Sequence, residues 1–243
     1  MFQLTPSATA VDSIQYDNAF RMCFSDPNQG SASADYIAEN KLATKVAIIY
    51  NSSDTYSSGI YQTFATEAKA KGLDVVAAEA FTADNKTDFS VQIQKAKDAG
   101  AELVFLPIYY QEASLILAQA NKAGFTPKWF GCDGMDGILD LDGFDASLAE
   151  DLMFLTPFTA NATDEATQKF VADYKEAFGD TPIQFAADAY DCVYVIKTAA
   201  EKEDVTPDKS VSDICDALKK GMTEITYDGL TGKSITWSED GEP

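Results

Sequence analysis

The sequence predicts an α/β protein with a doubly wound parallel sheet. Short apolar runs recur at intervals of about 23 to 29 residues, and segments with helical apolar stripes lie between them. That interval accommodates a strand followed by a crossover helix. The runs are apolar almost throughout, which is typical of strands covered on both faces in a parallel sheet.

Five runs in the middle of the chain are the predicted strands. They span residues 45–50, 73–78, 101–106, 128–131 and 151–155. Ala113, Ile116 and Ala120 lie three and four residues apart, as on one face of a helix over 111–122. Gly72 and Gly100 follow two further helical stripes and supply their stop signals. Residues 45–156 are therefore predicted to form one doubly wound α/β lobe.

The rest of the chain has a different pattern. The helices expected there span residues 163–178, 185–201 and 211–219, and a polar, Ser/Ala-rich helix is expected over 28–40. Short strands are expected at 2–5 and 20–24. The tail at 227–237 alternates polar and apolar residues and contains two turn dipeptides, so it predicts hairpin-like strands. These pieces do not make a complete second domain.

Charge and composition exclude several classes of function. The chain carries 18 Lys and Arg against 39 Asp and Glu, a formal net charge of −21. A nucleic-acid binder needs a basic face for the phosphates, so that class is excluded. The chain has no histidine, which removes the commonest general base and rules out Ser-His-Asp or Cys-His catalysis within it. We expect a binding protein without cofactors rather than an enzyme.

Cysteine spacing and motif searches add little chemistry. The four cysteines form no CxxC pair and are expected to be buried thiols, although two disulfides are conceivable. No GxGxxG, P-loop or GxSxG motif is present. The acidic stretch 133–145 lacks the spacing of an EF-hand loop, and we expect no metal. No apolar run is long enough to cross a bilayer, and no secretory signal is present.

Three loops follow predicted strands at the edge where doubly wound sheets bind ligands. They span residues 51–59, 107–112 and 131–134, and they contain Tyr56, Tyr109 and Asp133. A tyrosine pair and a fixed carboxylate suit a small zwitterion, with the carboxylate holding an ammonium group. The plainer alternative is that the tyrosines cover the core and that Asp133 caps a helix. Ser57 and Ser58 are expected to be helix caps rather than ligands.

Longer stretches resemble a known family, the type I periplasmic binding proteins. Within this family, the stretches look like those of the leucine, isoleucine and valine receptors of ABC importers for branched-chain amino acids. The stretches that carry the resemblance are 20–30, 45–50, 54–59, 88–90, 106–113, 131–134 and 185–191. They follow one another in the family's order along nearly the whole chain. The resemblance implies two α/β lobes, hinge closure on an amino acid, no enzymatic activity and an extracytoplasmic location.

The resemblance also assigns roles to residues. Residues 5–10 resemble the first-lobe loop that holds the amino acid's head group. Within it, the Ser7 carbonyl would accept from the ammonium group, Ala8 would lie between the contacts, and the Thr9 amide and hydroxyl would hold the carboxylate.

The second lobe contributes further contacts in the same resemblance. Tyr56 and Tyr109 would cover the ligand, and Asp133 would pair with its ammonium group. Some relatives carry a glutamate at this position, so the shorter Asp133 is a departure that bears on ligand choice. Phe185 would form a wall of the side-chain pocket.

The resemblance divides the chain into one near-complete lobe and one partial lobe. The second lobe would comprise residues 25–157 plus about 232–243, and the partial first lobe residues 1–24 and 158–231. The family pattern begins earlier than this chain, with a leader and the first strands of lobe one. Three explanations stay open: the chain is a fragment, it swaps elements with a second copy in a homodimer, or another chain supplies the missing strands.

Several functions are compatible with these features. The first is capture of an amino acid, expected to be branched-chain, for the membrane subunits of an ABC importer. The alternatives are a ligand-sensing domain of a receptor, a flavodoxin-like enzyme, and a folded fragment that binds nothing. The stretch 51–59 is too poor in glycine to favour the enzyme.

Overall fold

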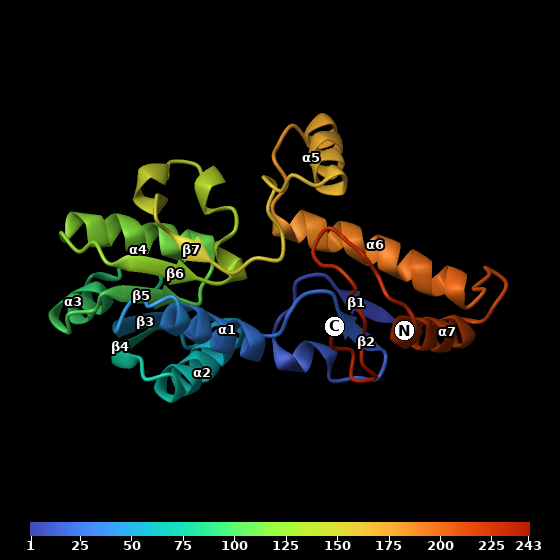
Figure 1. Cartoon of the computed structure of the whole chain (residues 1–243), viewed down its shortest axis with the longest axis horizontal. Helices are drawn as coiled ribbons and strands as arrows, with labels where there is room; N and C mark the ends of the chain where they lie inside the picture. The colour runs from blue at the N-terminus through green and yellow to red at the C-terminus, as the bar shows by residue number, and fades with distance from the viewer. The chain divides into compact units, whose positions relative to one another are not determined.

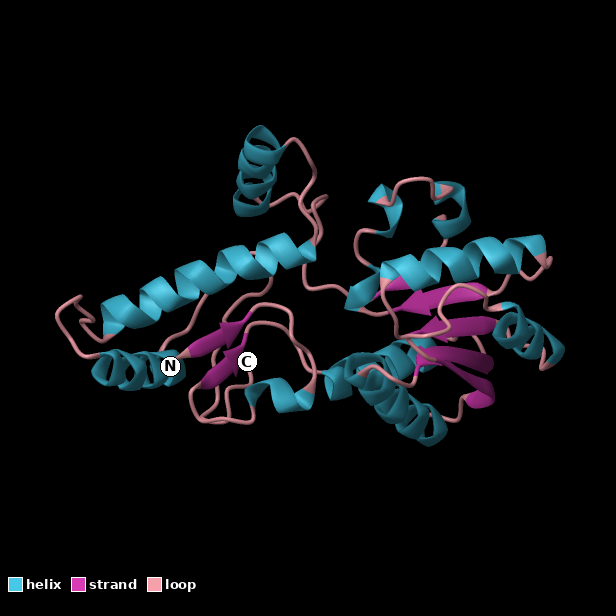
Figure 2. Cartoon of the chain, turned by 180° about the vertical axis from the view of Figure 1, so that it is seen from behind, coloured by secondary structure: helices cyan, strands magenta, loops and turns pink.

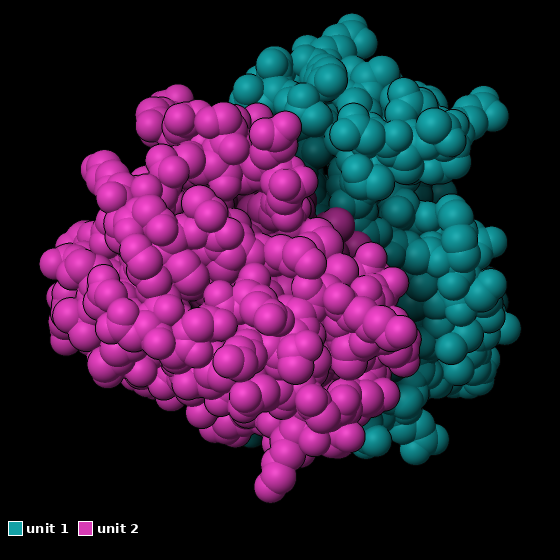
Figure 3. All heavy atoms as spheres, turned by 60° about the vertical axis from the view of Figure 1, so that its left-hand side comes forward, with its two compact units in different colours: residues 1–25, 157–243 teal, residues 26–156 magenta.

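The computed structural model describes residues 1–243, which divide into two compact units (Figure 3). Unit 1 comprises Met1–Ser25 and Pro157–Pro243, and unit 2 comprises Asp26–Thr156.

Unit 2 is built on a five-stranded parallel sheet in the order β4-β3-β5-β6-β7 (Figure 1). Its strands are β3 (Lys45–Asn51), β4 (Asp74–Phe81), β5 (Leu103–Leu106), β6 (Lys128–Gly131) and β7 (Met153–Phe154). All five predicted strands are confirmed, although the last is reduced to two residues. Because every strand is parallel, the five carboxyl ends lie along one edge of the sheet.

Helices cover both faces of this sheet, as the apolar runs predicted. The helices of unit 2 are α1 (Asp26–Glu39), α2 (Thr55–Ala70), α3 (Ser90–Asp98) and α4 (Tyr110–Lys122). Val46 and Ile48 pack in one core cluster with apolar residues of α1 and α2. Ala47 and Ile49 point the other way, into a second cluster with α3 and α4.

Capping groups mark the starts of α2 and α3, and the predicted glycine stop signals follow their ends. The Asp54 carboxylate accepts a hydrogen bond from the Tyr56 N–H at the start of α2. Asp88 accepts a hydrogen bond from the Ser90 N–H at 3.0 Å at the start of α3. Gly72 and Gly100 follow α2 and α3 with φ of 77° and 71°, in the left-handed region that favours glycine.

Residues 133–149 contain three short 3₁₀ turns. They are η2 (Asp133–Met135), η3 (Ile138–Asp140) and η4 (Ala146–Ala149). No group of three or more Cys, Asp or Glu side chains is arranged to hold a metal ion.

Unit 1 combines a small sheet with three helices (Figure 2). Its elements are β1 (Gln3–Thr5), η1 (Val11–Ile14), β2 (Ala19–Arg21), α5 (Glu165–Phe178), α6 (Gln184–Lys202) and α7 (Val211–Glu224). The two strands pair in parallel and form a sheet of their own. Phe20, Val195, Met222 and Trp237 are part of the core beneath it.

The tail differs from its prediction in two ways. Residues 227–237 form no strands, and only Tyr227 and Ile235 make an antiparallel bridge. The division by contacts also places residues 232–243 in unit 1, not with the second lobe. The reason is the buried indole of Trp237, whose Nε1–H donates to the Arg21 carbonyl at 2.7 Å.

The cysteines are free thiols, and no disulfide is formed. Cys23, Cys132 and Cys192 are buried, as expected from their apolar neighbours, and Cys215 is partly exposed. None of the helices combines the length and apolar character that a membrane crossing requires.

Candidate functional site

Unit 2 brings Tyr56, Tyr109 and Asp133 together at the carboxyl ends of β3, β5 and β6. The Tyr56 hydroxyl donates to Asp133 Oδ1 at 2.6 Å. The Tyr56 and Tyr109 rings stack with centroids 4.9 Å apart and an interplanar angle of 27°. We call these three residues the carboxylate–tyrosine cluster.

Backbone groups and one amide side chain hold this cluster in place. The Gly134 N–H donates to the Tyr56 hydroxyl at 3.0 Å. The Asp133 N–H donates to Gln29 Oε1 at 3.0 Å, which ties the loop to the first turn of α1. Asp133 and Tyr56 are buried, at 4% and 6% exposure, whereas Tyr109 is 42% exposed. The cluster therefore presents one open ring beside a fixed, covered carboxylate.

The local sequence explains this geometry. The Asp54 cap begins α2 and so places Tyr56 in the first turn of that helix. A Cβ atom at Gly134 would lie 2.8 Å from the Tyr56 hydroxyl and 2.9 Å from the Ile108 carbonyl oxygen. Only glycine fits without displacing these groups, so Gly134 allows the close approach of the tyrosine to Asp133.

Burial dominates the electrostatics of the cluster. Burial raises the pKa of the Asp133 carboxyl, and the hydrogen bonds from Tyr56 and Gln29 oppose that rise. Burial also raises the pKa of Tyr56 well above its usual range, and the Asp133 charge adds to the effect. The pKa of Tyr109 rises to about 12, first through burial and then through Asp54 and Asp133. Both phenols are neutral at physiological pH, and the surrounding carboxylates favour a cation.

The other predicted site residues lie in unit 1. Ser7, Ala8 and Thr9 share the loop between β1 and η1. The Ala8 carbonyl accepts from Arg21 Nη1 at 2.8 Å and from Ser13 Oγ at 3.1 Å. Thr9 is only 3% exposed.

Phe185 is half-buried in the first turn of α6, also in unit 1. The seven predicted site residues thus form one cluster in unit 2, one loop in unit 1, and the separate Phe185.

Ser57 and Ser58, predicted as helix caps, lie in the first turn of α2 but do not cap it, because Asp54 is the N-cap. Ser57 Oγ accepts from the Asn51 N–H at 2.8 Å, and Ser58 Oγ donates to the Asp54 carbonyl at 2.7 Å.

The sequence analysis missed two residues that organise these sites, Gln29 and Arg21. Gln29 lies in the stretch that carried the family resemblance, but a polar residue near a helix start gives no signal of its own. Arg21 gave a clearer signal, because it is a lone charge within the apolar strand 20–24. A charge in such a run is costly unless it is paired, which indicates a buried partner.

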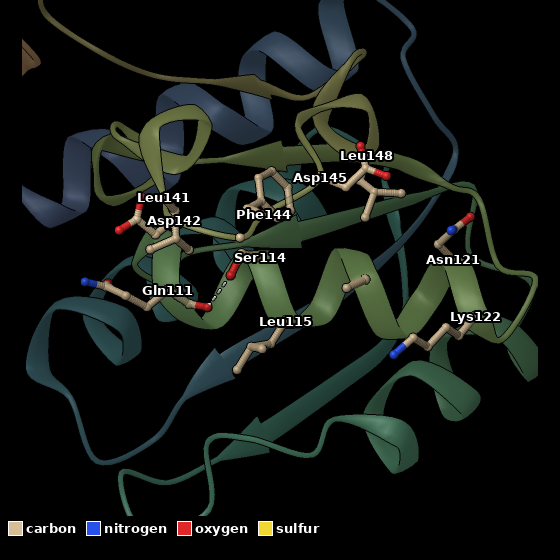
Figure 4. A pocket seen from close by; sticks show the side chains of 12 residues that line it. Gln111, Ser114, Leu115, Asn121, Lys122, Leu141, Asp142, Phe144, Asp145 and Leu148 are labelled. Atoms are coloured by element: carbon tan, nitrogen blue, oxygen red, sulfur yellow. Dashed lines mark hydrogen bonds between the residues drawn. The ribbon is translucent and has the colours of Figure 1, made fainter. Parts of the chain in front are cut away.

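A surface hollow of about 520 Å³ lies elsewhere on unit 2, lined by α4 and residues 141–148 (Figure 4). Leu115, Leu141 and Phe144 make much of its surface apolar, and Gln111 lies near one end. None of the predicted site residues lines it.

Curated relatives match this chain along its length. A Leu/Ile/Val-binding protein homologue from Brucella melitensis is 29% identical over 247 residues, covering 100% of this chain and 63% of the relative. A leucine-, isoleucine-, valine-, threonine- and alanine-binding protein from Pseudomonas aeruginosa is 28% identical over 95% of this chain and 60% of its own length. The chain therefore spans about three fifths of the length of these relatives.

Solved structures agree with the fold. A leucine-binding protein from Thermotoga maritima superimposes with a TM-score of 0.84 at 28% identity, covering 98% of this chain and 66% of that structure. A branched-chain amino acid transporter substrate-binding protein from Streptococcus pneumoniae, in complex with isoleucine, gives 0.83 at 28% identity with the same coverage. The predicted α/β fold with a doubly wound parallel sheet is thus that of type I periplasmic binding proteins.

The family model for periplasmic binding proteins matches residues 2–243. Members of this family bind solutes and are not enzymes, which agrees with the absence of histidine. A match over essentially the whole chain means that this protein belongs to the periplasmic binding protein family.

Proposed function

We propose that this chain captures an amino acid, expected to be branched-chain, as the substrate-binding component of an ABC importer. One observation carries the proposal: a buried carboxylate, Asp133, fixed by Tyr56 and placed beside the open ring of Tyr109. A carboxylate in this setting is a counter-charge for an ammonium group. Relatives named for binding leucine, isoleucine and valine support the substrate class.

The electrostatics favour a cationic group over a neutral one. A carboxylate that is largely removed from water carries a desolvation cost in the empty protein. An ammonium group beside Asp133 offsets that cost through a charge-assisted hydrogen bond. Tyr109 can then cover the apolar part of the ligand, because much of its ring is accessible in unit 2.

Unit 1 supplies the remaining contacts in this proposal. The Ser7 carbonyl accepts from the ammonium group, Ala8 spaces the loop, and the Thr9 amide and hydroxyl hold the ligand's carboxylate. Phe185 forms a wall around an aliphatic side chain.

The expected partners are the amino acid and the membrane subunits of the importer. The expected location is outside the cytoplasmic membrane. Nucleic acid is not a partner, since a net charge of −21 repels phosphates.

Calorimetric titration with leucine, isoleucine and valine tests the function. We expect binding by the wild type and a loss of about 100-fold in affinity, roughly 3 kcal/mol, for Asp133→Asn. That variant keeps an oxygen for the Tyr56 hydroxyl and removes only the charge. The matched control is Asp140→Asn, which removes a charge from an exposed position nearby and should bind as the wild type does.

The ligand can be varied in the same way. The 2-oxo acid that corresponds to leucine keeps the carboxylate and the side chain but lacks the ammonium group, so it should not bind. Equal affinity of wild type and Asp133→Asn for leucine would contradict the role of Asp133.

A thermal-shift screen of the proteinogenic amino acids separates the alternatives. A ligand that binds only the folded state raises the midpoint in a dose-dependent way. A cooperative melt that no amino acid shifts would instead support a folded protein without binding competence. A solution mass measured on the same sample shows whether two copies associate, as element swapping in a homodimer requires.

A further inference from the structure

We propose that Arg21 is the positioning residue of the binding loop in unit 1. Its guanidinium binds the carbonyls of Ala8, Ala10 and Val11, so that the N–H groups of the same peptides face away from it. The Thr9 N–H is the first of these donors. This inference rests on the proposed function, in which that donor holds the ligand's carboxylate.

The contacts of Arg21 with the loop are specific. The side chain lies on β2 and is fully buried. Nη1 donates to the Ala8 carbonyl at 2.8 Å, and Nη2 donates to the Ala10 carbonyl at 3.1 Å. Nη2 also lies 3.5 Å from the Val11 carbonyl oxygen. The planar guanidinium, whose N–H donors have a fixed geometry, thus binds three carbonyls of one short segment.

The geometry of the trans peptide bond determines which way the N–H groups of this loop point. The chain has no cis peptide bonds, and in a trans peptide the C=O and N–H groups point in opposite directions. When the Ala8 carbonyl points at Arg21, the Thr9 N–H points away from it. That N–H donates to no backbone carbonyl, although Thr9 is only 3% exposed. This N–H is therefore available to an acceptor from outside the loop, and a ligand carboxylate would satisfy it.

The tail holds Arg21 from the other side. Its Nε lies 3.1 Å from Glu242 Oε2, which balances the buried charge. Its carbonyl accepts from the Trp237 indole at 2.7 Å, and its N–H donates to the Gly241 carbonyl at 3.0 Å. Glu242 is therefore the tail residue that supports the guanidinium, whereas the Trp237 and Gly241 contacts hold the backbone of β2.

Two measurements on Arg21→Lys test the proposal, because lysine keeps the charge but has no planar fork. The first is hydrogen exchange at the Ser13 N–H, which is bonded to the Ala10 carbonyl in the same loop. We expect exchange at least tenfold faster there, with the amides of α6 unchanged. The second is calorimetric affinity for leucine, which should fall at least tenfold.

Trp237→Phe is the matched control. It removes the hydrogen bond to the Arg21 carbonyl and leaves the guanidinium in place. It should therefore lower the stability of the unit 1 core without selectively loosening the loop or weakening leucine binding.

Each outcome of these measurements either supports or contradicts the positioning role of Arg21. A folded Arg21→Lys with unchanged loop exchange would overturn the proposal, as would faster exchange with full leucine affinity. If the wild type binds no amino acid, the proposed function fails, and the exchange data alone then decide whether Arg21 orders the loop. If Arg21→Lys does not fold, Glu242→Gln replaces it: removing the counter-charge should speed loop exchange severalfold, and unchanged exchange would overturn the proposal.

Discussion

The two units bury their apolar side chains in different ways. Unit 2 covers both faces of a five-stranded sheet with helices, so its core consists of two large clusters on either side of the strands. Unit 1 has a sheet of two short strands and a smaller core. Aromatic residues of α5 and α6 form a chain of ring contacts through the buried Phe170. The chain includes Tyr174–Phe178 and Tyr190–Tyr194, each pair with ring centroids 4.7 Å apart.

The comparison shows where polar contacts replace packing. In unit 1, the buried Asp191 carboxylate accepts from the Leu230 and Thr231 N–H groups and from the Tyr227 and Thr231 hydroxyls. Arg21 similarly fastens the tail to the binding loop. Unit 2 therefore gains most from apolar burial, whereas unit 1 depends more on a few charged hydrogen-bond centres.

The largest expected difference comes from the same substitution in each unit. Phe105 is fully buried in unit 2 and stacks on Phe64 with centroids 4.0 Å apart, so Phe105→Ala should cost about 4 kcal/mol. Phe178 in unit 1 is 68% exposed, so Phe178→Ala should change stability by less than about 0.5 kcal/mol. Urea unfolding measures both. Similar losses would mean that the cost of removing a ring does not follow its burial.

A close helix crossing in unit 2 should be the next most sensitive point. A Cβ atom at Gly30 of α1 would lie 2.7 Å from the Ile60 carbonyl oxygen and from the Phe64 nitrogen, both backbone atoms of α2. Gly30→Ala should therefore destabilise the protein by about 2–3 kcal/mol. Ser31→Ala, on the same helix, is the control and should change the urea midpoint little. An unchanged midpoint for Gly30→Ala would mean that the helices can separate at no cost.

Each unit contains one tryptophan, which allows the units to be followed separately. Trp129 packs in unit 2 and Trp237 in unit 1. Trp129→Phe leaves Trp237 as the only reporter, and its fluorescence should change at a lower urea concentration than circular dichroism, which follows both units. Trp237→Phe should itself cost about 1 kcal/mol through the lost hydrogen bond. Coincident transitions would show that the units unfold together.

The smallest expected effect is the pH dependence contributed by Asp133. Because burial raises the pKa of this carboxyl in the folded state, the folded protein binds its proton more tightly than the unfolded chain does. Stability from this group therefore falls as pH rises from the unfolded pKa through the raised folded pKa. Urea unfolding across acidic pH should show Asp133→Asn gaining stability over the wild type as pH rises. A constant difference between them would contradict the raised pKa.

Periodicity in the sequence determined most of the secondary structure. The five strands of unit 2 and the helices between them were predictable because each depends on side chains a few residues apart. The shared sheet edge of Tyr56, Tyr109 and Asp133 was also predictable, since parallel strands end together. The lack of histidine and the family resemblance pointed to binding rather than catalysis.

Only the tertiary structure decided which polar groups meet. The Asp133 N–H and the Gln29 side chain are 104 residues apart in the sequence, and Trp237 and the Arg21 carbonyl are 216 apart. No local pattern specifies such pairs, because each forms only after packing has removed its members from water. For the same reason the sequence assigned the tail to the wrong lobe. The alternation of polar and apolar residues in the tail is a local pattern. The position of the tail depends on the core that buries Trp237 and on the ion pair between Glu242 and Arg21.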